Sequence, residues 1–162
     1  MNRVKWDNVK DRLHLPNALI DIHWVGSGKG LLRPVQIQKH CILCVDDDVV
    51  SMALRAEVLR KHGYSVVVYH CPFAATLCDF SIINLAIVDF EMPGLNGREL
   101  CLRIRAMGAR FPFVLLTGCL DAVSHEDRAV FARCIDKGMP IHYLLDTIAE
   151  VLEPNQVPDY GL

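Results

Sequence analysis

The sequence predicts an α/β fold in which helices cover both faces of a five-stranded parallel sheet. Short, continuous apolar runs such as 85–88 are typical of strands that are buried on both faces. Longer segments with apolar residues three or four positions apart, such as 141–152, indicate helices and alternate with these runs. With 162 residues and a hydrophobic content of 52%, the chain can bury one substantial core.

Five strands and five helices are expected from this alternation. The strands are predicted at 41–45, 64–69, 85–89, 112–117 and 131–135, and the helices at 49–62, 72–79, 97–107, a short segment from 124, and 141–152. Apolar triads predict the inward faces of the first and third helices: Val50, Leu54 and Val58, then Leu100, Ile104 and Met107. The alternation favours a flavodoxin-like, doubly wound sheet with the strand order 2-1-3-4-5.

Charge and turn residues divide the chain into three parts. Residues 1–40 carry seven Lys/Arg and three Asp/Glu (7 − 3 = +4), whereas residues 41–162 carry ten and sixteen (10 − 16 = −6). We predict a basic, flexible extension at 1–39, a folded domain at 40–153 and a short tail at 154–162. The glycines around Lys29 do not form a phosphate-binding loop, because no Ser or Thr follows that lysine.

Composition argues against several classes of protein. The net charge is −2, which gives no bias toward nucleic acids. No apolar run reaches the roughly 20 residues of a membrane span, and the N-terminus lacks a signal-peptide core. Cys41 and Cys44 fall in one predicted strand with side chains on opposite faces, which favours core packing over a metal or redox site. We expect a cytoplasmic protein with no membrane insertion and no direct nucleic-acid binding.

Polar residues follow four of the predicted strands. Asp46 and Asp47 follow the first strand, Asp89 ends the third, Thr117 ends the fourth and Lys137 follows the fifth. The carboxyl ends of parallel strands share one edge of the sheet, so these side chains can meet. Carboxylates about 4 Å apart repel by about 4 kcal/mol per pair, so the cluster must bind a cation or hold a proton. Oxygen ligands favour Mg²⁺, with Mn²⁺ possible, and the whole set suits phosphoryl transfer.

The motifs around these residues resemble the receiver domain of two-component response regulators. The resemblance rests on Val-Asp-Asp-Asp at 45–48, Val-Asp-Phe-Glu-Met-Pro-Gly-Leu-Asn-Gly at 88–97, Leu-Leu-Thr-Gly at 115–118 and Asp-Lys at 136–137. It covers about residues 40–153, in the order that the family has.

The resemblance implies a phosphoacceptor site. Asp89 would take a phosphoryl group from a sensor histidine kinase or a histidine phosphotransfer protein. Asp47 and Asp89 would ligate Mg²⁺ directly, Asp46 through water and Glu91 through its backbone carbonyl.

The resemblance also implies how the phosphoryl group would be held and released. Thr117 and Lys137 would contact it. The Glu91 side chain and Cys119 occupy positions that tune its loss. The protein would then be a signalling switch for an unidentified protein target. It would not be an enzyme, beyond slow loss of its own phosphoryl group.

Two departures from the family pattern leave other interpretations open. Cys134 stands where an aromatic switch residue is expected, and Gly138 stands where many relatives have proline. A pseudo-receiver that only binds partners is therefore the main alternative. A phosphatase of the haloacid dehalogenase type is a weaker one, because that class places Asp-x-Asp around its nucleophile on the first strand, whereas Asp89 is followed by Phe90 and Glu91 on the third. In a purely structural interpretation Asp46 and Asp47 form a solvated turn, and Lys137 faces solvent.

Overall fold

The structure is a computed structural model that describes residues 40–153, so the predicted extension at 1–39 and tail at 154–162 lie outside it. Its five strands form one parallel sheet with the predicted order β2-β1-β3-β4-β5. The strands are β1 (Cys41–Val45), β2 (Ser65–Tyr69), β3 (Leu85–Val88), β4 (Phe113–Thr117) and β5 (Arg133–Asp136).

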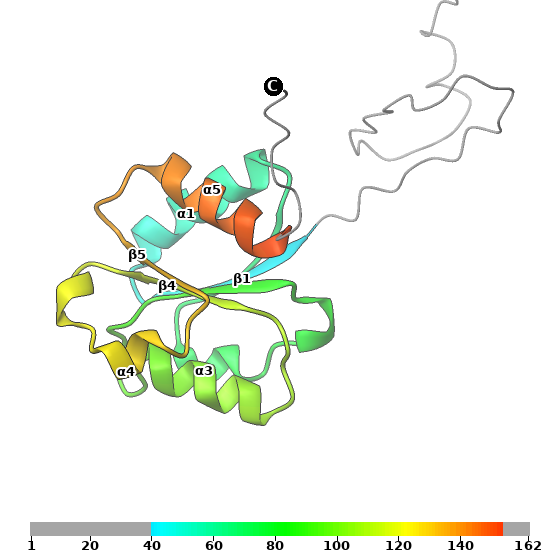
Figure 1. Ribbon diagram of the computed structural model, residues 1–162. Helices are drawn as coiled ribbons and strands as arrows, with labels where there is room; N and C mark the ends of the chain where they lie inside the picture. The colour runs from blue at the N-terminus through cyan, green and yellow to red at the C-terminus, as the bar shows by residue number, and fades with distance from the viewer. Residues whose placement is uncertain (1–39, 154–162) are drawn as a thin grey trace, which may run out of the picture. The chain divides into compact units, whose positions relative to one another are not determined.

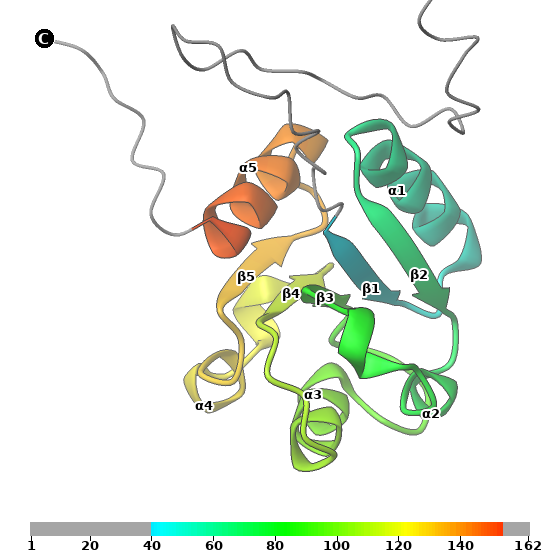
Figure 2. The same cartoon turned by 90° about the vertical axis from the view of Figure 1, so that its right-hand side faces the viewer.

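Helices cover both faces of the sheet, as Figures 1 and 2 show. Helices α1 (Val49–Lys61) and α5 (Ile141–Leu152) lie on one face, and α2 (Pro72–Ala75), α3 (Gly97–Ala106) and α4 (His125–Arg128) lie on the other. Two short 3₁₀ helices, η3 (Phe80–Ile82) and η4 (Leu120–Ala122), precede β3 and α4. The fold class predicted from the sequence is confirmed.

The sheet separates two apolar clusters. Leu43 and Val45 of β1 pack with α3, whereas Ile42 and Cys44 pack with α1 and α5. Cys41 belongs to the α3 side, so the two thiols of the Cys-x-x-Cys segment do point to opposite faces. Burial raises the pKa of Cys44 to about 12, which keeps this thiol protonated at neutral pH. The prediction that these cysteines serve core packing fits this arrangement.

The predicted inward face of α1 is wrong. Val50 and Leu54 are 80% and 70% exposed, whereas Met52, Ala56 and Leu59 are buried. Both sets follow a helical period, since residues i, i+4 and i+7 also share one face. Apolar residues thus lie on both sides of α1, and periodicity alone could not choose between them.

Three other boundaries or faces differ from the prediction. Met107 lies just beyond α3 and is 55% exposed, because the helix has already ended. The fifth strand starts at Arg133 rather than 131, and Phe131 is buried in the preceding turn. The helix predicted at 72–79 stops at Ala75.

Candidate functional site

Three carboxylates meet at the carboxyl edge of the sheet. Asp46 and Asp47 directly follow β1, and Asp89 directly follows the neighbouring strand β3. The Asp89 backbone N–H donates to the carbonyl of Val45 over 2.9 Å, which fixes the two strand ends side by side. One oxygen from each carboxylate lies within 4.8 Å of the others. Asp46 and Asp89 are buried, and Asp47 is exposed.

Two cations contact this cluster. The Lys137 Nζ lies 2.9 Å from Asp46 Oδ2 and 3.1 Å from Asp89 Oδ2. The Arg55 Nη1 of α1 lies 3.1 Å from the same Asp46 oxygen. Lys137 is positioned by its backbone, because its N–H donates to the carbonyl of Thr117 over 2.7 Å. The structure therefore brings Lys137 to the carboxylates rather than leaving it in solvent.

Burial and neighbouring charges shift the pKa values of both Asp89 and Lys137. Burial raises the pKa of Asp89 and outweighs the opposing effect of Lys137. For Lys137, burial lowers the pKa, but the hydrogen bonds and charges of Asp46 and Asp89 outweigh it, so the net shift is upward. An isolated ion pair would lower the pKa of the acid. Here the loss of water around Asp89 is the larger effect, so its ionised form is held at a cost in stability.

Thr117 ends β4 on the same edge. It is buried, and its hydroxyl oxygen accepts the N–H of Cys119 over 3.4 Å. Cys119 itself is exposed. Glu91 lies two residues beyond Asp89 and is also exposed. The roles predicted for Thr117, Glu91 and Cys119 stay predictions.

A tight loop carries the chain from Asp89 into α3. The Asp89 carboxylate accepts the N–H of Phe90 over 2.8 Å, and the N–H of Gly97 donates to the carbonyl of Phe90 over 2.9 Å. A Cβ on Gly97 would lie 2.3 Å from the Asp89 carbonyl oxygen, closer than real side chains approach. Asn96 caps α3 in a reciprocal capping box with Glu99. The Asn-Gly pair therefore lets α3 start directly against the Asp89 backbone.

The turn after β5 explains how the Gly138 departure is accommodated. The N–H of Gly138 donates to Asp136 Oδ1 over 2.7 Å. Proline has no N–H and could not make this bond. Cys134 is half-buried beside the α3 cluster, and its thiol lies 3.9 Å from the carbonyl of Arg128 in α4.

Sequence reasoning missed two partners of Asp46. Arg55 was not singled out, although it is an arginine on the helix that directly follows two strand-end carboxylates. The His70 Nδ1 lies 3.2 Å from the backbone carbonyl of Asp46. Asp48 caps α1 by accepting the N–H groups of Val50 and Ser51.

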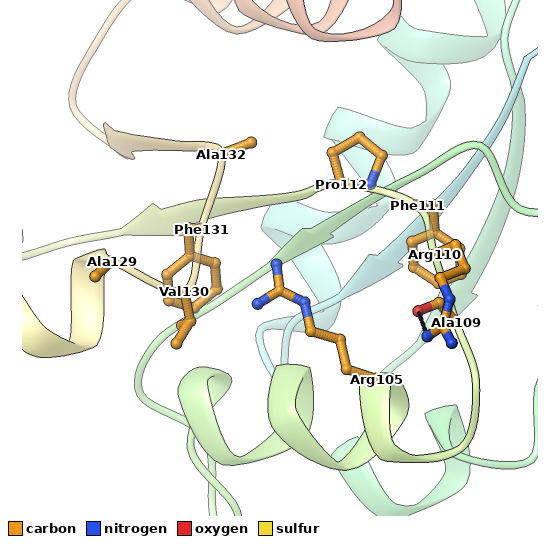
Figure 3. Close-up of a pocket in the computed structure, with 9 residues that line it drawn as sticks. All are labelled: Arg105, Ala109, Arg110, Phe111, Pro112, Ala129, Val130, Phe131 and Ala132. Carbon is orange, nitrogen blue, oxygen red and sulfur yellow. Dashed lines mark hydrogen bonds between the residues drawn. The ribbon is translucent and has the colours of Figure 1, made fainter.

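One cavity of the described fold is lined by Arg55 and Lys137, the two cations that contact the carboxylate cluster, and another lies away from it. A groove of about 310 Å³ runs beside Lys137 between α1 and the start of α5, with Leu54 and Ile141 among its lining residues. A second cavity of about 460 Å³ is lined by residues 109–112, by residues 129–132 and by Arg105 (Figure 3). These two segments precede β4 and β5, so this cavity lies at the opposite, amino edge of the sheet. Its lining includes arginines but no carboxylate.

The chain matches one family of known domains. The profile of the response regulator receiver domain matches residues 42–148. Regulatory protein VanR of Enterococcus faecium is 37% identical over 78 residues, which are 48% of this chain and 33% of VanR. Sensor protein GacS of Pseudomonas syringae pv. syringae is 29% identical over 123 residues, which are 72% of this chain and 13% of GacS. The chain thus spans a third or less of the length of these two relatives.

Solved structures show the same architecture. The response regulator protein TrrA of Thermotoga maritima, determined in complex with Mg²⁺-BeF, has a TM-score of 0.65 and 27% identity, covering 70% of this chain and 99% of TrrA. Chemotaxis protein CheY4 of Vibrio cholerae has a TM-score of 0.65 and 23% identity, covering 70% of this chain and 99% of CheY4. Across residues 40–153, no helix combines the length and the hydropathy that a membrane crossing requires.

The close approach at Gly97 predicts a strong effect of one methyl group. We expect Gly97→Ala to lower the free energy of unfolding by about 2 kcal/mol or more, because the new Cβ would collide with the Asp89 carbonyl. Urea unfolding measures the change. Gly118→Ala is the matched control, because a Cβ there meets nothing within 4 Å. Equal stability of both variants would contradict the close approach of Gly97 to the Asp89 carbonyl.

The raised pKa of Asp89 predicts how stability changes with pH. A folded-state pKa above the unfolded value of about 3.8 stabilises the fold fully only below that value, and this stability is lost as the pH rises through the folded-state pKa. Without metal, Asp89→Asn should therefore be more stable than wild type at pH 7, and the difference should shrink as the pH falls toward 4. Thermal unfolding in EDTA across this range tests it. A wild type that is the more stable protein at pH 7 would refute the prediction.

Proposed function

The chain belongs to the response regulator receiver domain family, and from this premise we propose that it is a phosphoacceptor switch in two-component signalling. Asp89 takes a phosphoryl group from a sensor histidine kinase or a histidine phosphotransfer protein. The observation that carries this proposal is the carboxylate cluster, in which buried Asp89 lies 3.1 Å from the Lys137 ammonium and beside Asp46 and Asp47.

The donor set fits a hard divalent cation. Three carboxylates offer oxygens within 4.8 Å of one another, and such ligands suit Mg²⁺ or Mn²⁺. Asp47 and Asp89 would hold the ion directly, Asp46 through water and Glu91 through its carbonyl. When bound, the ion supplies positive charge that neutralises phosphoryl oxygens. The Mg²⁺-BeF complex of TrrA supports this assignment by similarity.

The chain's own residues perform the transfer. An Asp89 carboxylate oxygen attacks the phosphorus of a phosphohistidine, the P–N bond breaks, and its electron pair returns to the imidazole. The Lys137 ammonium already contacts the Asp89 carboxylate and balances the charge that arrives with the phosphoryl group. The Thr117 hydroxyl, at the same sheet edge, donates a hydrogen bond to that group. The transfer leaves the chain itself phosphorylated on Asp89, so the protein acts as a switch rather than as an enzyme that turns over a substrate.

An exposed apolar surface beside the site suits a protein donor. Val50 and Leu54 of α1, Met139 of the β5–α5 connection and Ile141 at the start of α5 are all more than 40% exposed, and three of these four line the groove next to Lys137. A donor that docks there would bring its phosphohistidine to the sheet edge. The phosphorylated domain then acts on a protein target, through the face near α4 and β5.

Phosphorylation of Asp89 is the direct test. We expect incubation with acetyl phosphate and Mg²⁺ to add one phosphoryl group, about 80 Da by intact-mass spectrometry. The adduct should be lost in Asp89→Asn and retained in Asp121→Asn, which removes an exposed aspartate just beyond β4. An absent adduct would favour the pseudo-receiver alternative, and steady release of phosphate would favour a phosphatase.

Mg²⁺ should stabilise the folded protein. A ligand that binds only the folded state adds about 2.7 kcal/mol at a hundredfold excess over its Kd, which raises the melting temperature by several degrees. Asp47→Ala should abolish this shift. Asp48→Asn is the matched control, because it changes the neighbouring aspartate, which caps α1 and lies outside the cluster. A Mg²⁺-dependent shift that survives in Asp47→Ala would exclude the proposed site.

A further inference from the structure

We propose that Arg55 is a built-in counterion of Asp46 that competes with the divalent cation and so weakens Mg²⁺ binding by the carboxylate cluster. This inference rests on the proposed function and concerns the regulation of that same site. Its starting observation is the 3.1 Å contact between Arg55 Nη1 and Asp46 Oδ2, whose side chains are only 10% and 2% exposed. A contact this well shielded from water is weakly screened by salt.

The acceptor atoms of Asp46 are largely occupied by protein donors. Its Oδ2 receives both Arg55 and Lys137, and its Oδ1 accepts the N–H of Asp48 over 2.9 Å. An ionised carboxylate offers about four acceptor positions, so three are already used. Direct ligation of a metal by Asp46 would compete with these donors. Asp47 and Asp89 are correspondingly the freer ligands.

Arg55 also changes the net charge that a cation meets. The three carboxylates and Lys137 alone would sum to −2 (−3 + 1), and Arg55 brings the cluster to −1 (−3 + 2). The cluster therefore attracts a doubly charged ion less strongly. The loss is greatest where little water is present, because charges interact more strongly at a low dielectric constant. The metal-free state is stabilised instead, because the positive charge of Arg55 partly neutralises the repulsion among the carboxylates.

The two cations have different contacts. Lys137 is shared between Asp46 and Asp89, whereas Arg55 contacts Asp46 alone. Negative charge added at Asp89 would draw Lys137 toward it. Arg55 would then keep the buried Asp46 paired, which matters because a buried charge without a partner is strongly destabilising. Arg55 is therefore a positioning residue for Asp46 as well as a competitor of the metal.

The test compares Mg²⁺ affinity in variants of the full chain by isothermal titration calorimetry. In Arg55→Gln the side chain keeps an N–H donor for Asp46 but loses the charge, and we expect Mg²⁺ to bind about fivefold or more tightly. Arg55→Lys keeps the charge and should stay within about twofold of wild type. Lys61→Gln is the matched control, because it removes one charge from α1 at a residue whose side chain is 72% exposed and pairs with Glu57.

The outcomes separate this inference from the proposed function. If Arg55 served only to hold the fold together, Arg55→Gln would lower the melting temperature and leave the Mg²⁺ affinity unchanged or weaker, which overturns the inference. Phosphorylation of Asp89 in that same variant would leave the proposed function standing. Binding of Mg²⁺ by Arg55→Gln but not by wild type would support the inference and count against the function. Absence of Mg²⁺ binding in both proteins would overturn both.

Discussion

Repulsion among three carboxylates at one sheet edge is the constraint around which the site is built. Asp46 and Asp89 lie next to each other because each directly follows its strand and β1 and β3 are neighbours, and both are buried there. Lys137 from beyond β5 and Arg55 from α1 are drawn to this negative charge. The ion pairs consequently tie together elements from both ends of the described chain. Because the cluster still carries a net negative charge with both cations present, it attracts further positive charge.

The strand-end residues could be predicted from the sequence, for a topological reason. In a parallel sheet, every residue that directly follows a strand lies at the same edge, whatever the details of packing. Recognising the apolar runs was therefore enough to predict that Asp46, Asp89 and Thr117 lie at one edge of the sheet. Lys137 was also placed correctly, although the strand before it begins two residues later than predicted. Phe131 extended the apolar run at its start without belonging to the strand.

The orientation of α1 could not be predicted, and Arg55 was missed for the same reason. Apolar residues occur on opposite sides of this helix, so the rotation about its axis depends on which side fits the sheet. With Met52 and Leu59 inward, Arg55 lies three residues after one and four before the other, on the buried stripe. The prediction that Val50 and Leu54 face inward did not place Arg55 on the side of α1 that faces the sheet. One error in a helix face thus concealed a member of the site.

The missing side chain at Gly97 has a mechanical consequence. The helix α3 starts so close to the Asp89 carbonyl that this stretch of backbone cannot shift toward the helix without displacing it. The next residue, Arg98, forms ion pairs with Asp127 at 3.2 Å and Glu126 at 3.4 Å, both in α4. A series of contacts therefore leads from Asp89 to α4 without passing through Cys134. The helix α4, whose Arg128 carbonyl contacts Cys134, is thus connected to the Asp89 backbone through the ion pairs of Arg98.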